Sequence, residues 1–119
     1  MKVAVTATGK ELDSPVDPRF GRAPYIVIVD SDEMTVEALD NKENMNALKG
    51  AGIQAATMVS DHGAEVLLTG HCGPNAFKAL QAADIGVANN ATGTVREAVT
   101  AYLEGKLPLA DDSDVEGHW

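Results

Sequence analysis

Short apolar runs separated by turn-forming residues divide the first third of the chain into predicted strands. Residues 3–7 alternate between larger apolar and smaller or polar side chains, and Gly9 ends this first strand before a turn-rich loop over residues 10–24. The β-rich run at 25–30 and a second run at 34–39 are separated by a short polar turn, which is typical of a hairpin. We therefore predict three strands, joined by one long loop and one tight turn.

The remainder of the chain alternates between helical and strand patterns. Ile53, Ala56 and Val59 recur at helical spacing after a polar loop, and we expect them on the buried face of the first helix. His62 falls in the last turn of that helix, where capping is its expected role. The predicted order after the hairpin is this helix with Gly63 at its C′ position, a strand at 66–69, a helix opened by Gly73 and Pro74, a strand at 85–88, and a helix from the capping box at Thr94 to Gly105.

The order βββαβαβα joins an antiparallel beginning to two βαβ crossovers, which require helices on both faces of a shared sheet. This predicts an α/β fold, a three-layer α/β/α sandwich of the ribonuclease-H-like kind with a mixed five-stranded sheet. The 119 residues, of which 45% are apolar, are enough for one domain that folds unaided. We place this domain at residues 1–108 and a flexible acidic tail at residues 109–119, because the last segment has little to bury.

The charge balance restricts the classes of partner. Nine basic and eighteen acidic residues give a net charge of -9, which repels nucleic acids and anionic membranes. No apolar run approaches the roughly twenty residues of a membrane span, and the N-terminus lacks a secretory signal, so we expect a cytoplasmic protein. The single cysteine, Cys72, excludes an intrachain disulfide, a zinc finger and a ferredoxin cluster. We also expect a monomer.

Four glycine-containing loops are predicted to meet at one edge of the sheet, because the strands before them run in the same direction. These loops are residues 16–23, 49–52, 70–75 and 89–94. The last three each lead into a helix, whose first N–H groups and partial positive charge attract anions, while glycine lets a ligand approach the backbone. This edge of the sheet is therefore a candidate anion site.

Two arginines in the first of these loops, Arg19 and Arg22, have two interpretations. With Phe20 between them, they add two permanent cations beside an aromatic ring, which indicates a local positive site on an acidic body. Alternatively, the arginines are surface residues paired with Asp13 or Asp17, and Phe20 belongs to the core. The residues alone leave both interpretations open.

The pattern of reactive residues favours binding over catalysis. Cys72 and His71 are types that bind copper, iron or zinc, but two neighbours are too few for a closed metal site, and a buried thiol beside a loop histidine is the alternative. The first strand offers no carboxylate for a two-metal nuclease. The motifs G-x-x-x-x-G-K-[ST], G-x-S-x-G and H-E-x-x-H do not occur. We therefore expect that the protein is not an enzyme.

Three blocks of residues carry a resemblance to a known family. They are VDPRFGRA at residues 16–23, GAGI at 50–53 and LTGHCGPNA at 68–76. In this order and spacing they resemble the dinitrogenase iron-molybdenum cofactor biosynthesis family, which includes small stand-alone proteins similar to the cofactor carriers. The match runs from Met1 to about Pro108. Within this family the chain resembles the branch from archaea and anaerobic bacteria that includes the orange protein, which carries a molybdenum-copper sulfide cluster.

The resemblance implies a ribonuclease-H-like fold without nuclease activity, and a role in binding or carrying a metal-sulfur cluster or its precursor. The implied cargo is a molybdenum-iron or molybdenum-copper sulfide, held non-covalently by charge and hydrogen bonds. Cys72 and His71 are candidate metal ligands because of their residue types, a thiol and an imidazole. The complete set of expected site residues is Arg19, Phe20, Gly21, Arg22, Gly50, Gly52, Gly70, His71, Cys72, Gly73, Pro74 and Asn75.

Two other functions remain open at this point. One is a regulatory or scaffolding module that binds a protein partner, such as a cluster-assembly ATPase, with the long loop at residues 10–24. The other is a binder of small phosphate ligands at the same helix N-termini. A binding fold is reused for different cargo, so the sequence leaves the metal, the donor and the acceptor open.

Overall fold

Five strands form one mixed sheet in the computed structural model, which describes residues 1–45 and 50–110. The strands are β1 (Lys2–Ala7), β2 (Tyr25–Asp30), β3 (Thr35–Asp40), β4 (Val66–Leu68) and β5 (Gly86–Ala88), in the spatial order β3-β2-β1-β4-β5. β1 lies at the centre, antiparallel to β2 and parallel to β4, with Val5 opposite both Val27 and Leu68. Because β3 is antiparallel to β2 and β5 is parallel to β4, the strands β1, β3, β4 and β5 run in one direction, as predicted.

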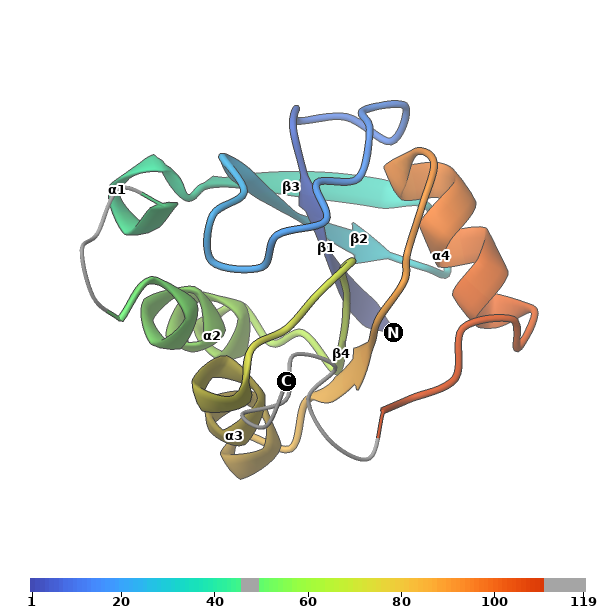
Figure 1. The fold of residues 1–119 in the computed structure, drawn as a ribbon. Helices are drawn as coiled ribbons and strands as arrows, with labels where there is room; N and C mark the ends of the chain where they lie inside the picture. Colours follow the sequence, from blue (N-terminus) through green and yellow to red (C-terminus); the bar gives the residue numbers. More distant parts are fainter. Residues whose placement is uncertain (46–49, 111–119) are drawn as a thin grey trace.

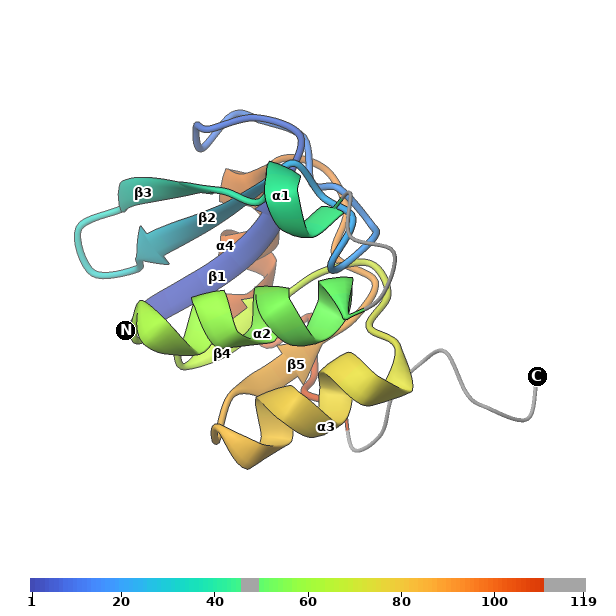
Figure 2. The same ribbon diagram turned by 90° about the vertical axis from the view of Figure 1, so that its left-hand side faces the viewer.

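Helices cover both faces of this sheet (Figures 1 and 2). The helices are α1 (Lys42–Met45), α2 (Ala51–Asp61), α3 (Pro74–Ala82) and α4 (Val95–Leu103). The alternation of β1 sends Ala4 into the core beneath α2 and α3, whereas Val3 and Val5 pack in the core beneath α4. The predicted three-layer α/β/α sandwich is therefore confirmed.

Three local expectations were wrong. The polar stretch after β3 contains α1, a helix of four residues that is too short to show an apolar period. Met34 belongs to the turn, with φ 55°, so β3 begins one residue later than predicted. Ile53 is 47% exposed instead of buried, because α2 packs through its small residues and one valine, namely Ala51, Ala55, Ala56 and Val59.

The end of α2 agrees with the expectation from sequence. His62 follows α2 directly, and its Nδ1 donates to the carbonyl oxygen of Met58 at 2.9 Å, which closes the helix as predicted. After α4 the chain returns along β5, where the N–H of Ala110 donates to the carbonyl of Val87 at 2.7 Å. The predicted acidic tail lies outside the described residues from residue 111 onward, so its boundary at residue 108 stays a prediction. No helix in the described ranges is long and apolar enough to cross a membrane.

Candidate functional site

The loops that follow β1, β4 and β5 are joined by backbone hydrogen bonds at the predicted edge of the sheet. The N–H of His71 donates to the carbonyl of Pro18 at 2.7 Å, and the N–H of Phe20 donates to the carbonyl of His71 at 3.2 Å. The N–H of Asn90 donates to the carbonyl of Gly70 at 3.0 Å. The two bonds between the loops after β1 and β4 join residues that lie more than fifty positions apart, as the strand directions required.

Two glycines allow the loop after β1 to lie against its neighbours. A Cβ atom at Gly70 would stand 2.5 Å from the Cβ of Pro18 and 2.7 Å from its carbonyl oxygen, so only glycine fits there. Gly21 has φ 90°, and a Cβ atom on it would stand 3.0 Å from the Cα of Gly52 in α2. The loop is therefore in backbone contact with the strand end on one side and with α2 on the other.

A cavity of about 250 Å³ lies where this loop meets the first turns of α2 and α3. Its walls are Phe20, Arg22, Gly50, Ala51, Gly52, Ile53, Asn75 and Ala76. Arg22 is the one charged side chain among them, and Phe20 is both a cavity wall and a core residue with 8% exposure. Five of the predicted site residues therefore meet at this cavity: Phe20, Arg22, Gly50, Gly52 and Asn75.

Two helices begin at the cavity without a side-chain cap. Gly50 precedes α2 and Gly73 precedes α3, and neither helix has an acidic residue in its first turn. The first N–H groups of a helix have no partner within the helix, and they carry its partial positive charge. Pro74 removes one of these groups from α3. The cavity therefore combines a guanidinium with the positive ends of two neighbouring helices.

The start of α4 does not line the cavity, and its first N–H groups are bonded within the protein. This differs from the expectation that the loop at residues 89–94 offers free N–H groups to an anion. The hydroxyl of Thr94 accepts from the N–H of Glu97 at 3.1 Å, and the Glu97 carboxylate accepts from the N–H of Thr94 at 2.9 Å. The N–H of Val95 donates to the carbonyl of Ser14 at 2.9 Å. Because the capping box and the loop after β1 satisfy these donors, they are not available to an anion.

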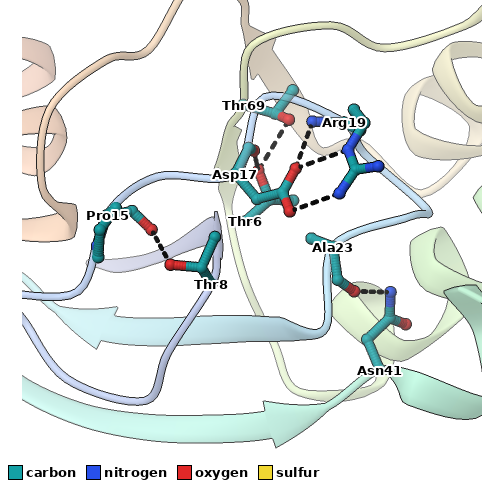
Figure 3. A network of polar contacts seen from close by, with 8 residues as sticks. All are labelled: Thr6, Thr8, Pro15, Asp17, Arg19, Ala23, Asn41 and Thr69. Carbon is teal, nitrogen blue, oxygen red and sulfur yellow. Dashed lines mark hydrogen bonds and ion pairs between the residues drawn. The ribbon is translucent and has the colours of Figure 1, made fainter.

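Arg19 does not line the cavity, because its guanidinium is bound by Asp17 (Figure 3). Nε donates to Oδ1 at 3.2 Å, Nη2 donates to Oδ2 at 3.1 Å, and the backbone N–H of Arg19 donates to Oδ1 at 3.0 Å. The hydrogen bonds that the Arg19 side chain donates to Asp17, and then the charge of Asp17, raise the pKa of Arg19 above its ordinary value. Of the two interpretations of the arginines, pairing with Asp17 is thus observed for Arg19.

Asp17 itself is anchored in a buried polar network (Figure 3). Asp17 is buried, with 2% exposure, and its backbone N–H donates to the carbonyl of Thr6 at 2.9 Å. The hydroxyl of Thr6 donates to the carbonyl of Asp17 at 2.6 Å and lies 2.8 Å from the hydroxyl of Thr69. From sequence, Asp17 was expected only as a surface partner of the arginines, so its burial was missed. The sequence signal for this role of Asp17 is its place two positions before Arg19. At that spacing an aspartate accepts a hydrogen bond from the backbone N–H in an Asx turn.

A match to a known protein family establishes which family this chain belongs to. The family described as dinitrogenase iron-molybdenum cofactor matches residues 1–105. The chain belongs to this family. The match includes all three sequence blocks that carried the resemblance, so that prediction is confirmed.

Relatives of this family member cover nearly its whole length. The apo form of the orange protein from Desulfovibrio gigas is 48% identical, with a TM-score of 0.92 over 95% of both chains. A Thermotoga protein that carries the provisional name NifB is 36% identical, with a TM-score of 0.78 over 91% of both chains. An uncharacterized protein of Methanocaldococcus jannaschii is 27% identical over 109 residues, 90% of this chain and 89% of its own.

The family's name raises the question of metal ligands. Within residues 1–45 and 50–110, no three His, Cys, Asp or Glu side chains are placed to hold a metal ion together. Cys72 is fully buried in the core beneath α2 and α3, with its Sγ 3.7 Å from the carbonyl of Gly73, whereas His71 is exposed. Neither residue lines the cavity. Direct metal ligation by Cys72 or His71 therefore stays a prediction.

Proposed function

We propose that this protein is a non-catalytic carrier that binds an anionic metal-sulfur cluster, or a precursor of one, in the cavity at the starts of α2 and α3. The observation that carries the proposal is the convergence of Arg22 and two uncapped helix starts on one cavity of a molecule with a net charge of -9. The family description and the similarity to the apo form of the orange protein support a cofactor as the cargo. The proposed place of action is cluster biosynthesis or trafficking in the cytoplasm.

The groups at the cavity fit a cargo that brings its own ligands. A guanidinium and backbone N–H groups form charge-assisted hydrogen bonds to the sulfide or oxo atoms of a molybdenum-iron or molybdenum-copper sulfide. Phe20 and the apolar side chain of Ile53 provide walls that exclude water from one side of the cargo. Since such contacts form no covalent bond, the protein releases the cargo without a chemical step, which is what a carrier requires.

An anaerobic titration of the purified apo-protein tests this proposal. Thiomolybdate with and without Cu(I), and iron sulfide, are added in turn while visible absorption is recorded. We expect a saturable change with one of them, and we expect Arg22→Ala to weaken the binding about tenfold or more, because charge-assisted hydrogen bonds are lost. Arg96→Ala is the matched control, because Arg96 pairs with Asp13 at 3.3 Å and does not line the cavity.

Two other outcomes would overturn the proposal. A protein that stays colourless with every cargo but co-purifies stoichiometrically with a partner, such as a cluster-assembly ATPase, would be a partner-binding module. A protein that binds inorganic phosphate or a nucleotide at the cavity, and no metal sulfide, would be a phosphate binder.

A further inference from the structure

The segment at residues 111–119 concentrates negative charge. The family match ends at residue 105, and the part of the chain that the structure describes ends at residue 110, so this segment lies beyond both. We call it the acidic tail. It contains no lysine or arginine and four carboxylates, namely those of Asp111, Asp112, Asp114 and Glu116. The relationship to the family therefore does not account for this charge.

Most cations in the described residues have an anionic or aromatic neighbour. The ion pairs are Arg19–Asp17, Arg96–Asp13 and Lys106–Glu104, and the ammonium groups of Lys10 and Lys42 lie 5.5 and 5.0 Å from the centre of the Tyr25 ring. Lys2 begins β1, and Lys78 lies in α3 itself. None of these groups is a wall of the cavity at the starts of α2 and α3.

The cavity holds positive charge without a carboxylate in its walls. Arg22 and two helix starts supply that charge, and no acidic residue of the described chain lines the cavity. The acidic residues nearest in sequence to α2 and α3 lie elsewhere: Asp61 and Asp84 are at the opposite ends of these helices, and Glu43 lines a separate cavity. An anionic segment of the chain therefore finds unbalanced positive charge here.

The acidic tail starts on the side of the sheet that carries this cavity. Ala110 packs against the core beneath α2 and α3, and its N–H donates to the carbonyl of Val87 in β5. The nine residues of α3 span about 14 Å as a helix, whereas nine extended residues span about 30 Å. Since Ala110 and α3 pack against the same core, the tail is long enough to reach the start of α3.

We propose that the acidic tail occupies the cavity of the apo-protein as an internal anion, which the cargo displaces. The inference rests on the proposed carrier function, because it assigns the tail and the cargo to the same positive site. Carboxylates accept hydrogen bonds from a guanidinium and from the first N–H groups of a helix, as an anionic cargo does. The rest of the chain, with nine basic and fourteen acidic residues, repels the tail.

An internal anion regulates loading and release of the cargo. The apparent affinity for the cargo falls in proportion to the fraction of molecules whose cavity is open. Weakly bound anions are thereby excluded, and the tail refills the cavity when the cargo leaves. The tail thus favours release of a non-covalently held cargo to an acceptor.

A nitroxide label on the acidic tail tests its position in the full-length apo-protein. Cys72 is fully buried, so Gly117→Cys provides a surface thiol for labelling without a change of charge. We expect the label to broaden the amide signals of residues 51–53 and 75–76 most strongly. The signals of α4 should be the least affected, because α4 packs on the opposite face of the sheet. Reduction of the nitroxide should restore all signals.

Two charge variants of the labelled protein test why the tail lies there. Neutralisation of the tail, by Asp111→Asn, Asp112→Asn, Asp114→Asn and Glu116→Gln, should reduce the broadening at the cavity several-fold. The matched control neutralises four exposed acids that do not line the cavity, by Glu33→Gln, Glu37→Gln, Asp61→Asn and Asp84→Asn. This control has the same net charge as the tail variant and should keep the broadening.

An anaerobic thiomolybdate titration of the same two sets of substitutions, without the label, tests the competition. We expect the neutralised tail to give about fivefold tighter binding, or more, than the matched control, because its cavity is open in a larger fraction of molecules. The equal net charge of the two variants makes the long-range repulsion of the anion similar in both.

The two readouts separate this inference from the carrier function. Any of four results overturns the tail as an internal anion: strongest broadening away from the cavity, unchanged broadening in the neutralised tail, broadening of isotope-labelled protein by the nitroxide of a second copy, or equal affinities of the two charge variants. Absence of saturable thiomolybdate binding in every variant overturns the carrier function instead, and the label still reports where the tail lies.

Discussion

The two arginines of the loop after β1 stand three positions apart and meet different surroundings. Arg19 is bound by the buried carboxylate of Asp17, whereas Arg22 lines the cavity. The sequence predicts that both are near the site, because both belong to one glycine-containing loop. It does not predict their division, because that depends on the burial of Asp17 against Thr6 at the end of β1.

This division predicts different effects of two similar substitutions on cargo binding. Arg19→Ala should keep the affinity for thiomolybdate within about threefold. It should lower the midpoint of urea unfolding, because it removes the guanidinium that donates to the buried carboxylate of Asp17. Arg22→Ala should weaken the binding of thiomolybdate about tenfold or more, because Arg22 lines the cavity. Anaerobic titration and urea unfolding of the two variants measure both properties. Equal losses of affinity in the two variants would mean that Arg19 also contacts the cargo.

Asp17 is expected to be the main anchor of the loop. Asp17→Ala leaves the donors of Arg19 and the nearby backbone without their acceptor, and we expect a loss of about 1–3 kcal/mol in the free energy of unfolding. Asp13→Ala is the control, because the Asp13 carboxylate is 79% exposed and its pairing with Arg96 is at the surface. Equilibrium urea unfolding measures both variants. Similar values for the two would show that burial of the Asp17 carboxylate does not stabilise the loop.

At the scale of elements, the junction between the loops after β1 and β4 depends on a glycine that nothing else can replace. Gly70→Ala places a methyl group against the backbone of Pro18, and we expect destabilisation of about 2 kcal/mol or more together with weaker cargo binding. Gly73→Ala, in the same loop, meets no atom within 4 Å and has φ -68°, so only the modest cost of alanine at a helix N-cap, below about 1 kcal/mol, is expected. Thermal unfolding of the pair is the measurement. A stable Gly70→Ala variant would contradict the observed contact.

The start of α4 provides a test of which helices hold the cargo. Thr94→Ala removes the capping box and should cost about 1 kcal/mol of stability. Cargo affinity should be unchanged, because the N-terminus of α4 is satisfied within the protein and does not line the cavity. Urea unfolding and the thiomolybdate titration measure the two effects. A large loss of affinity for thiomolybdate would mean that the loop at residues 89–94 also contacts the cargo.

The elements that the sequence predicted are those with strong local signals. The strands, the three longer helices and the capping box at Thr94 follow from period, glycine and cap residues. The short helix α1 carries no such signal, and Ile53 is misassigned because α2 packs through alanines, which leaves its larger side chain outside. The same exposed isoleucine then becomes part of the cavity, so the misassigned position is the one that contributes to the candidate site.

At the scale of the whole molecule, an acidic body surrounds one local positive cavity. The parallel directions of β1, β4 and β5 bring distant loops to one edge, and this could be derived from the order of elements. The capping box of α4 could be predicted, but the bond from the N–H of Val95 to the carbonyl of Ser14 could not, because it depends on where the loop after β1 lies. The burial of Cys72 likewise follows from packing beneath α2 and α3 and not from its neighbours in sequence.

The most direct measurement of the central claim is an amide chemical-shift map of the isotope-labelled apo-protein, recorded anaerobically during titration with the metal sulfide that it prefers. Within residues 1–110, we expect saturable shifts confined to residues 20–22, 50–53 and 73–76, with the amides of residues 94–96 unaffected. Saturable shifts centred on α4 or on β3, or no shifts with any cargo, would contradict the claim that the cavity at the starts of α2 and α3 holds the cluster.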